Sequence, residues 1–305
     1  MVALAARSLR LVDRLLLAYL ALAGIIAAFR IPSRPRAAWA LVVYALVAAL
    51  ILLLGDDRVG RVGRTLREIY PIALLPILYA SLDLVNGFDI RVWDPVVRGW
   101  EELLFGGQIS RSWWQERPSA FWSTLLHAAY FAYYLIVPLP VVWFLLTGRL
   151  ERARETVTLI LATFLLCYLC FQLFPVAGPY YEFPRPSGEF MANWAARLVY
   201  GTLDQGSSYG AAFPSSHVAA TIAASIGAWR GSARFGLALA VPTGLLAVGV
   251  VYCQMHYAVD AVAGAAVALA VAAVGLRRGR TEAHESGRVP GRVRDGPTAT
   301  QQAEG

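Results

Sequence analysis

The chain has 305 residues, of which 58% are hydrophobic and 15% are charged. An ordinary soluble domain carries about 25% charged residues, so the composition excludes that class and indicates an integral membrane protein. The net charge of +7 comes from arginine alone, because the sequence contains no lysine. Arginines at helix ends hold a membrane protein at the surface of the bilayer, and we therefore expect no nucleic-acid partner.

Apolar runs of membrane-spanning length follow one another along most of the chain. The first run follows a basic N-terminus, as in a signal peptide, but the RIPSRPR sequence after it is not a small-residue cleavage site, so we predict a retained span. Pro138 and Pro140 predict a kink or a break in the fourth run. The sequence thus predicts an all-α, polytopic membrane helix bundle of about eight transmembrane helices, at 15–29, 37–54, 69–86, 119–146, 156–175, 213–229, 235–252 and 258–276.

Composition divides the chain into three parts. Residues 1–68 form a predicted transmembrane hairpin, and residues 69–276 hold the other six predicted helices. Residues 277–305 are rich in Arg, Gly, Pro and polar residues, and we expect a disordered tail there.

The arginines also predict a topology. With the N-terminus inside, the cytoplasmic segments hold 18 arginines and the opposite side holds 9. Cytoplasmic loops carry the excess of basic residues, so we expect both termini in the cytoplasm. Loops 177–212 and 253–257 then lie outside, on the same side of the membrane.

Segment 87–118, also outside, contains a predicted amphipathic helix in VWDPVVRGWEELLF. Such a helix lies in the membrane interface, and a structural collar is favoured over substrate contact. Its apolar residues recur at helical spacing: Trp93, Val96, Val97, Trp100, Leu103 and Leu104. The charged residues Arg98, Glu101 and Glu102 lie opposite them. Two further tryptophans, Trp113 and Trp114, act as anchors.

The three cysteines lie inside apolar segments. Cys167 and Cys170 form a CxxC, but no histidine or carboxylate lies near them, so small buried hydrophobic residues are favoured over zinc or redox chemistry, also for Cys253.

Two histidine motifs carry the chemistry. In HYAVD, His256 and Asp260 are four residues apart and share one helix face. A carboxylate bonded to one imidazole nitrogen fixes the tautomer and leaves the other nitrogen as a nucleophile or base. A structural histidine with a nearby acid is the alternative, but Asp260 would be costly in lipid without a partner, which favours function.

In FPSSH, Pro214 can start a helix whose first turn places the Ser215 and Ser216 hydroxyls beside free backbone N–H groups. Such a terminus favours a phosphate, and His217 can donate a proton to a departing oxygen. The alternative is an ordinary serine cap with an interfacial histidine.

Other polar residues are candidates for the same site. The sequence VAGPYYEFPRPSGEF offers Arg185 as a phosphate partner, with Tyr180 and Tyr181 beside it. For Arg197 we favour an interfacial anchor. Asp83 and His127 lie in the outer halves of predicted helices, where they would line the pocket, pair with each other, or form a buried polar link.

FPSSH followed by HYAVDAVAG resembles the second and third signatures of the type 2 phosphatidic acid phosphatase superfamily, which includes lipid phosphate phosphatases and vanadium haloperoxidase-like proteins. The stretches GPYYEFP, WDPVVRGWEELLFGGQ and LLHAAYFAYY are most similar to bacterial relatives of the fungal inositol-phosphorylceramide synthase. The resemblance covers residues 80–275. It implies a six-helix phosphatase-like core after two additional N-terminal helices. It also implies that the protein is located in the bacterial inner membrane.

The resemblance implies a role for each matching residue. His256 is the nucleophile that forms a phosphohistidine, Asp260 orients it, and His217 protonates the leaving alkoxide and then activates water or an alcohol. Ser215 and the N–H groups around Ser216 hold phosphate oxygens. Arg185 is the matching cation, and no metal or other cofactor is implied.

Two positions depart from the family signatures. Gly178 stands where the first signature has lysine, and Gly249 and Val250 stand where the third has Ser-Arg. Two cationic phosphate contacts are therefore missing, which favours a phosphodiester over a more highly charged monoester.

Two other functions remain as alternatives. Eight helices with kinks would suit a lipid transporter or scramblase, although the polar residues gather towards one face. A metal or haem site on His127, His217 and His256 lacks a ligand spacing. Three questions stay open: which membrane lipid is the substrate, whether the reaction is hydrolysis or transfer, and what the oligomeric state is.

Overall fold

The computed structural model describes residues 9–54 and 61–286, and of residues 61–65 and 276–286 the backbone alone. Within these ranges the chain is helical and contains no strand, apart from an isolated bridge between Val176 and Ala211. The predicted all-α membrane bundle is confirmed. Helix α15 continues to Ser286, and the rest of the expected tail lies outside the described residues.

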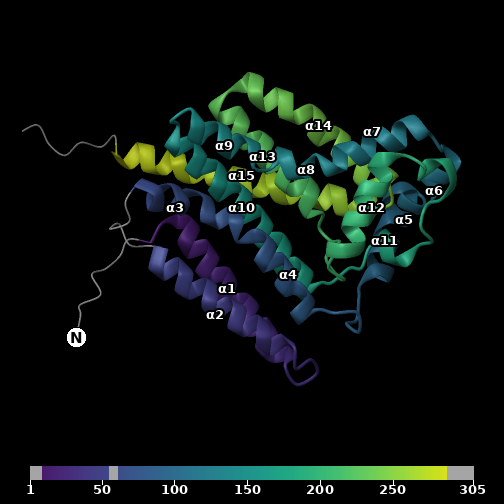
Figure 1. Cartoon of the computed structure of the whole chain (residues 1–305), viewed down its shortest axis with the longest axis horizontal. Coiled ribbons are helices and arrows are strands. Elements are labelled where there is room, and N and C mark those ends of the chain that lie inside the picture. Colours follow the sequence, from purple (N-terminus) through teal and green to yellow (C-terminus); the bar gives the residue numbers. More distant parts are fainter. Residues whose placement is uncertain (1–8, 55–60, 287–305) are drawn as a thin grey trace, which may run out of the picture.

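The first four helices make three membrane crossings. α1 and α2 lie along one flank of the bundle, where α1 packs against α10 (Figure 1). α3 and α4 are interrupted at Leu74 and together supply the third span, Leu66–Val85. Their bounds are Leu11–Arg30, Ala37–Leu54, Arg61–Ala73 and Leu75–Val85.

The predicted break in the fourth crossing is confirmed. Residues 120–146 form three short helices with interruptions at Ala132 and at Val137–Pro138, and they cross the membrane as one 27-residue span. Proline cannot donate the backbone hydrogen bond that would continue the preceding turn. The helices are α7 (Ala120–Phe131), α8 (Tyr133–Ile136) and α9 (Leu139–Leu146).

The centre of the bundle is α13, Ser216–Gly231, which packs against α10 (Leu150–Leu173), α14 (Ala233–Tyr252) and α15 (Ala258–Ser286). Its small residues permit this close packing, because Ala219, Ala220 and Ala223 are fully buried. Seven described helical segments are long and apolar enough to span a membrane. α13, at the sixth of the eight predicted spans, is not among these seven. With 16 residues it is about 24 Å long, shorter than the bilayer core.

The remaining helices gather at the end of the bundle opposite the end of α15 (Figure 1). They are α5 (Asp94–Phe105), α6 (Ile109–Glu116), α11 (Pro179–Glu182), the 3₁₀ turn η1 (Gly188–Phe190) and α12 (Trp194–Gly206). Segments far apart in sequence therefore meet over the start of α13 and of α15.

The orientation of α5 differs from the expectation. Asp94, Val97 and Glu101 are fully buried, whereas Leu103 and Leu104 are 82% and 64% exposed. We expected Glu101 on the polar outer face. It is buried because it accepts a backbone hydrogen bond from Ala258, a contact that the local pattern of polar and apolar residues does not encode.

Candidate active site

The two histidine motifs meet in space. His217 lies in the first turn of α13 and His256 in the turn before α15, and their ring centroids are 5.8 Å apart. Ser215 caps α13, since its hydroxyl accepts a hydrogen bond from the N–H of Val218 at 3.4 Å. The structure therefore brings together the two side chains that the sequence singled out.

Asp260 supports His256 from behind. Its Oδ2 lies 3.4 Å from Nδ1 of His256 and accepts a hydrogen bond from the N–H of Tyr257 at 2.8 Å. Asp260 is fully buried, and His256 is 5% exposed. Because Nδ1 faces the carboxylate, Nε2 is the ring nitrogen left for a substrate.

Two tyrosines that we did not predict surround His217. The hydroxyl of Tyr130 is 3.2 Å from Nε2 of His217, and the two rings stack with centroids 4.8 Å apart. The Tyr133 ring lies 4.4 Å away on another side. Their sequence signal is the LLHAAYFAYY stretch, which carried the family resemblance without a role for either tyrosine.

A small cavity opens at the histidine pair. Its volume is about 40 Å³, which is enough to admit water. Hydroxyl groups dominate its polar lining, and none of its described lining residues is an arginine. The lining comprises Tyr79, Tyr130, Tyr180, Tyr181, Ser207, Ser208, His217 and His256, with Ala177, Leu203, Ala211, Ala212 and Met255.

Arg185 stands beside the cavity and does not line it. Its Nη2 is 2.8 Å from Oδ1 of Asp204 and donates to the Tyr180 hydroxyl, also at 2.8 Å. Hydrogen bonds from Tyr180 and Arg185 lower the pKa of Asp204, so the carboxylate stays charged and offsets the guanidinium. The side chain of Arg185 remains 52% exposed.

The two departures from the family signatures have a steric basis. Gly178 has a φ of +90°, and a Cβ there would lie 2.8 Å from Cβ of Ala212. A Cβ on Gly249 would lie 2.9 Å from the carbonyl oxygen of Leu126, and Val250 is fully buried. Any side chain at Gly178 or Gly249 would require its neighbours to shift, and a cation in place of Val250 would be buried.

The remaining predicted site residues have separate partners. Asp83 accepts a hydrogen bond from the Ser208 hydroxyl at 2.6 Å, so it reaches the cavity through a residue that lines it. His127 is fully buried, and its Nδ1 lies 2.7 Å from the Ser123 carbonyl oxygen. Ser216 begins α13 and is 5% exposed.

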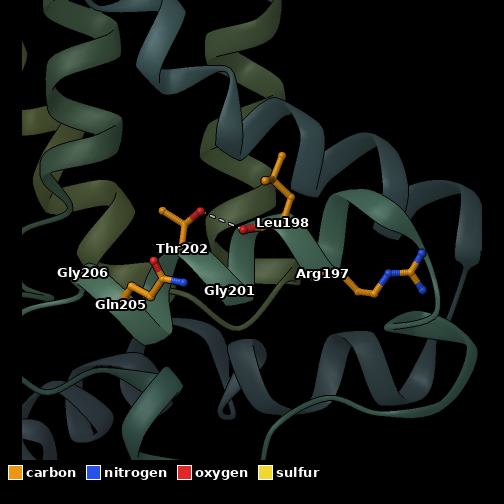
Figure 2. Close-up of a pocket in the computed structure, with 6 residues that line it drawn as sticks. All are labelled: Arg197, Leu198, Gly201, Thr202, Gln205 and Gly206. Atoms are coloured by element: carbon orange, nitrogen blue, oxygen red, sulfur yellow. Dashed lines mark hydrogen bonds between the residues drawn. The ribbon is translucent and has the colours of Figure 1, made fainter.

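A second hollow lies along α12, away from the histidines. It is lined by Leu198, Gly201, Thr202 and their neighbours, and the Arg197 side chain extends away from the other side chains in Figure 2. Arg197 donates a hydrogen bond to the carbonyl oxygen of Ala192 and does not line the histidine cavity.

The described residues contain no group of three or more His, Cys, Asp or Glu side chains that could hold a metal ion. Cys167, Cys170 and Cys253 are all free thiols.

The family model described as PAP2 superfamily matches residues 101–274, more than half of the chain. The chain belongs to the PAP2 superfamily. Both histidine motifs of this PAP2 protein fall inside the matched region, and Asp94 falls outside it. Membership supports an enzyme with phosphatase-type activity on lipid phosphates. Neither the curated proteins nor the solved structures gave a significant match.

Proposed function

We propose that this protein is an integral membrane lipid phosphatase or phosphotransferase that works through a phosphohistidine on His256. The observation that carries the proposal is the facing pair of His217 and His256, with ring centroids 5.8 Å apart and Asp260 behind His256. One histidine can attack phosphorus while the other serves the leaving oxygen.

The reaction proceeds in two steps. Nε2 of His256 attacks phosphorus, the bond from phosphorus to the leaving oxygen breaks, and His217, in its protonated form, gives that oxygen a proton. Neutral His217 then takes a proton from water or from an alcohol, whose oxygen attacks phosphorus as the P–N bond breaks. Asp260 stabilises the positive charge that His256 carries in the intermediate.

The phosphoryl group would be held mainly by neutral donors. Ser215 and the free N–H groups at the start of α13 lie beside His217, and the lining adds tyrosine and serine hydroxyls. Arg185 is the candidate cation, with its charge offset by Asp204. A phosphodiester carries one negative charge where a monoester carries nearly two. The cation-poor lining therefore supports a diester-linked head group and transfer in the manner of the inositol-phosphorylceramide synthase branch.

We further propose that the site acts at the extracytoplasmic face, with residues 69–276 as the catalytic domain and 1–68 as an added hairpin. The arginine distribution supports this orientation, since the smaller share lies on the side of the histidine loops.

The test is lipid-product mass spectrometry on purified protein in vesicles. Wild type, His256→Ala and the exposed control Arg197→Gln are each given phosphatidic acid or phosphatidylinositol, with and without a lipid alcohol and with excess chelator. We expect head-group release or transfer from the diester by wild type and the control, and none by His256→Ala. Equal products from wild type and His256→Ala overturn the catalytic assignment, and turnover of phosphatidic acid alone overturns the preference for a diester.

A further inference from the structure

Asp94, the first residue of α5, joins two distant parts of the candidate site. Its Oδ2 accepts a hydrogen bond from the N–H of Ala177 at 2.7 Å, and its Oδ1 accepts one from the N–H of Gly178 at 2.8 Å. Oδ1 also accepts a hydrogen bond from the Tyr257 hydroxyl at 3.0 Å. One fully buried carboxylate thus takes three donors: one from Ala177 in the cavity wall, one from the adjacent Gly178 and one from the residue after His256.

Glu101 makes a related contact two turns further along α5. Its Oε1 accepts a hydrogen bond from the N–H of Ala258, in the first turn of α15, at 3.1 Å. Asp260 takes the preceding N–H, that of Tyr257. Two carboxylates therefore hold consecutive backbone N–H groups directly after His256, one from α15 itself and one from α5.

The burial of the Asp94 and Glu101 carboxylates costs too much free energy for these contacts to be incidental. A buried carboxylate is unfavourable unless it is well bonded, so an apolar side chain at either position would suit a passive collar better. The side-chain bonds of Asp94 end on residues 177, 178 and 257, and Glu101 bonds residue 258 as well as the backbone of residues 109 and 110. Residues 177, 178, 257 and 258 adjoin the cavity or His256.

We propose that Asp94 is a positioning residue, which fixes His256 relative to Ala177 in the cavity wall and to the adjacent Gly178, with Glu101 holding the first turn of α15. This inference rests on the proposed function, because it assigns the role to catalysis through His256. Asp94 acts through Tyr257 and the backbone, and it does not line the cavity.

The geometry requires an aspartate at this position. An aspartate offers two acceptor oxygens, whereas an asparagine offers one oxygen and one NH₂ donor. In Asp94→Asn the NH₂ group, a donor, would face one of the groups that donate a hydrogen bond to Asp94, and that hydrogen bond would be lost. The asparagine has almost the same shape, so the change disrupts the bonding and leaves the volume unchanged.

The experiment measures kcat, KM and inhibition by vanadate, an analogue of the pentacoordinate phosphoryl group, per mole of folded protein. The variants are Asp94→Asn, Tyr257→Phe and the double variant, with Glu102→Gln, an exposed neighbour on α5, as the matched control. We expect Asp94→Asn to lower kcat by roughly 10- to 100-fold with KM changed by less than about 3-fold. The vanadate inhibition constant rises in parallel with the fall in kcat.

We expect Tyr257→Phe to lose roughly 3- to 10-fold in kcat, and the double variant to lose less than the product of the single losses, because both changes break one contact. A purely structural role would lower the melting temperature and leave kcat per folded molecule and vanadate affinity unchanged, and that result overturns the proposal. If Asp94→Asn does not fold, Tyr257→Phe decides, since it removes a single hydroxyl, and a wild-type kcat there also overturns it.

Failure of the proposed function gives a different pattern. In that case wild type lacks lipid turnover, or His256→Ala retains it. An inactive His256→Ala beside a fully active Asp94→Asn leaves the proposed function in place and removes the positioning role.

Discussion

The backbone N–H of Ser215 donates a hydrogen bond to the backbone carbonyl oxygen of Asp260, 2.9 Å away. This single bond joins the cap of α13 to the first turn of α15. It therefore links Ser215, two residues before His217, to Asp260, the partner of His256. Side chains held by two backbones that touch keep their separation without a flexible linker.

Gly264 permits this contact. A Cβ there would lie 2.4 Å from the carbonyl oxygen of Ser215, so Gly264→Ala must push the starts of α13 and α15 apart. We expect at least a 10-fold loss of kcat and a melting temperature lower by about 3–8 °C. The matched control is Gly275→Ala on the same helix, where a Cβ meets nothing within 4 Å and activity is retained. Equal behaviour of the two variants in the activity and melting assays would contradict the argument.

Tyr130 contacts Nε2 of His217, and both residues line the cavity. Tyr130→Phe removes the hydroxyl at 3.2 Å and keeps the stacked ring. We expect kcat to fall about 3- to 10-fold, with the melting temperature within about 2 °C of wild type. Tyr134→Phe, a neighbouring tyrosine that is 50% exposed, serves as the control. A normal kcat in Tyr130→Phe would show that the hydroxyl does not support His217.

Arg185 and Asp204 set the charge at the rim of the cavity. We expect Arg185→Gln to raise KM for an anionic lipid by about 3- to 10-fold and Asp204→Asn, which frees the guanidinium, to lower it by about 2- to 5-fold. Both effects shrink as salt is added, because both groups are about half exposed. Initial rates over a substrate range at two salt concentrations measure this. A fall in KM for both variants would exclude Arg185 as a substrate contact.

The sequence was sufficient for the bundle and for the histidine pair. Apolar runs of fixed length predict membrane spans, because lipid offers the backbone no hydrogen-bond partners and a helix satisfies the backbone N–H and C=O groups internally. The spacing of His256 and Asp260 predicted a shared helix face; the two side chains do meet at 3.4 Å, but His256 lies in the turn before α15 and not in the helix. Both signals are local in sequence.

The contacts that the sequence did not reveal are long-range. Tyr130 meets a histidine 87 residues away, and Asp94 meets backbone N–H groups 83 and 84 residues away. The pattern of α5 suggested a polar outer face because Glu101 looks like a surface residue until its partner at Ala258 is known. Gly178 and Val250 looked like positions of missing cations, and the steric limit at Gly178 and the burial of Val250 appear only when their neighbours are placed.

Glu101 should make folding stability depend on pH. The pKa of Glu101 is raised from 4.5 to about 7, because burial, together with the nearby charge of Asp260, outweighs the lowering effect of the hydrogen bond from the Ala258 N–H. Between these two pH values the folded protein binds more protons than the unfolded chain, so stability falls as pH rises from 4.5 to 7 and levels off above that. Glu101→Gln carries no titratable proton and should lose this component.

Melting temperatures at pH 5, 6, 7 and 8 in one detergent test this dependence. Relative to Glu101→Gln, we expect the wild type to lose on the order of 2–5 °C between the lowest and highest pH. Glu102→Gln, on the exposed side of α5, should follow the wild-type curve. The comparison between variants cancels the titration of every other carboxylate. If Glu101→Gln runs parallel to the wild type, Glu101 does not titrate in this range, and the cost of its burial is met by its hydrogen bonds instead.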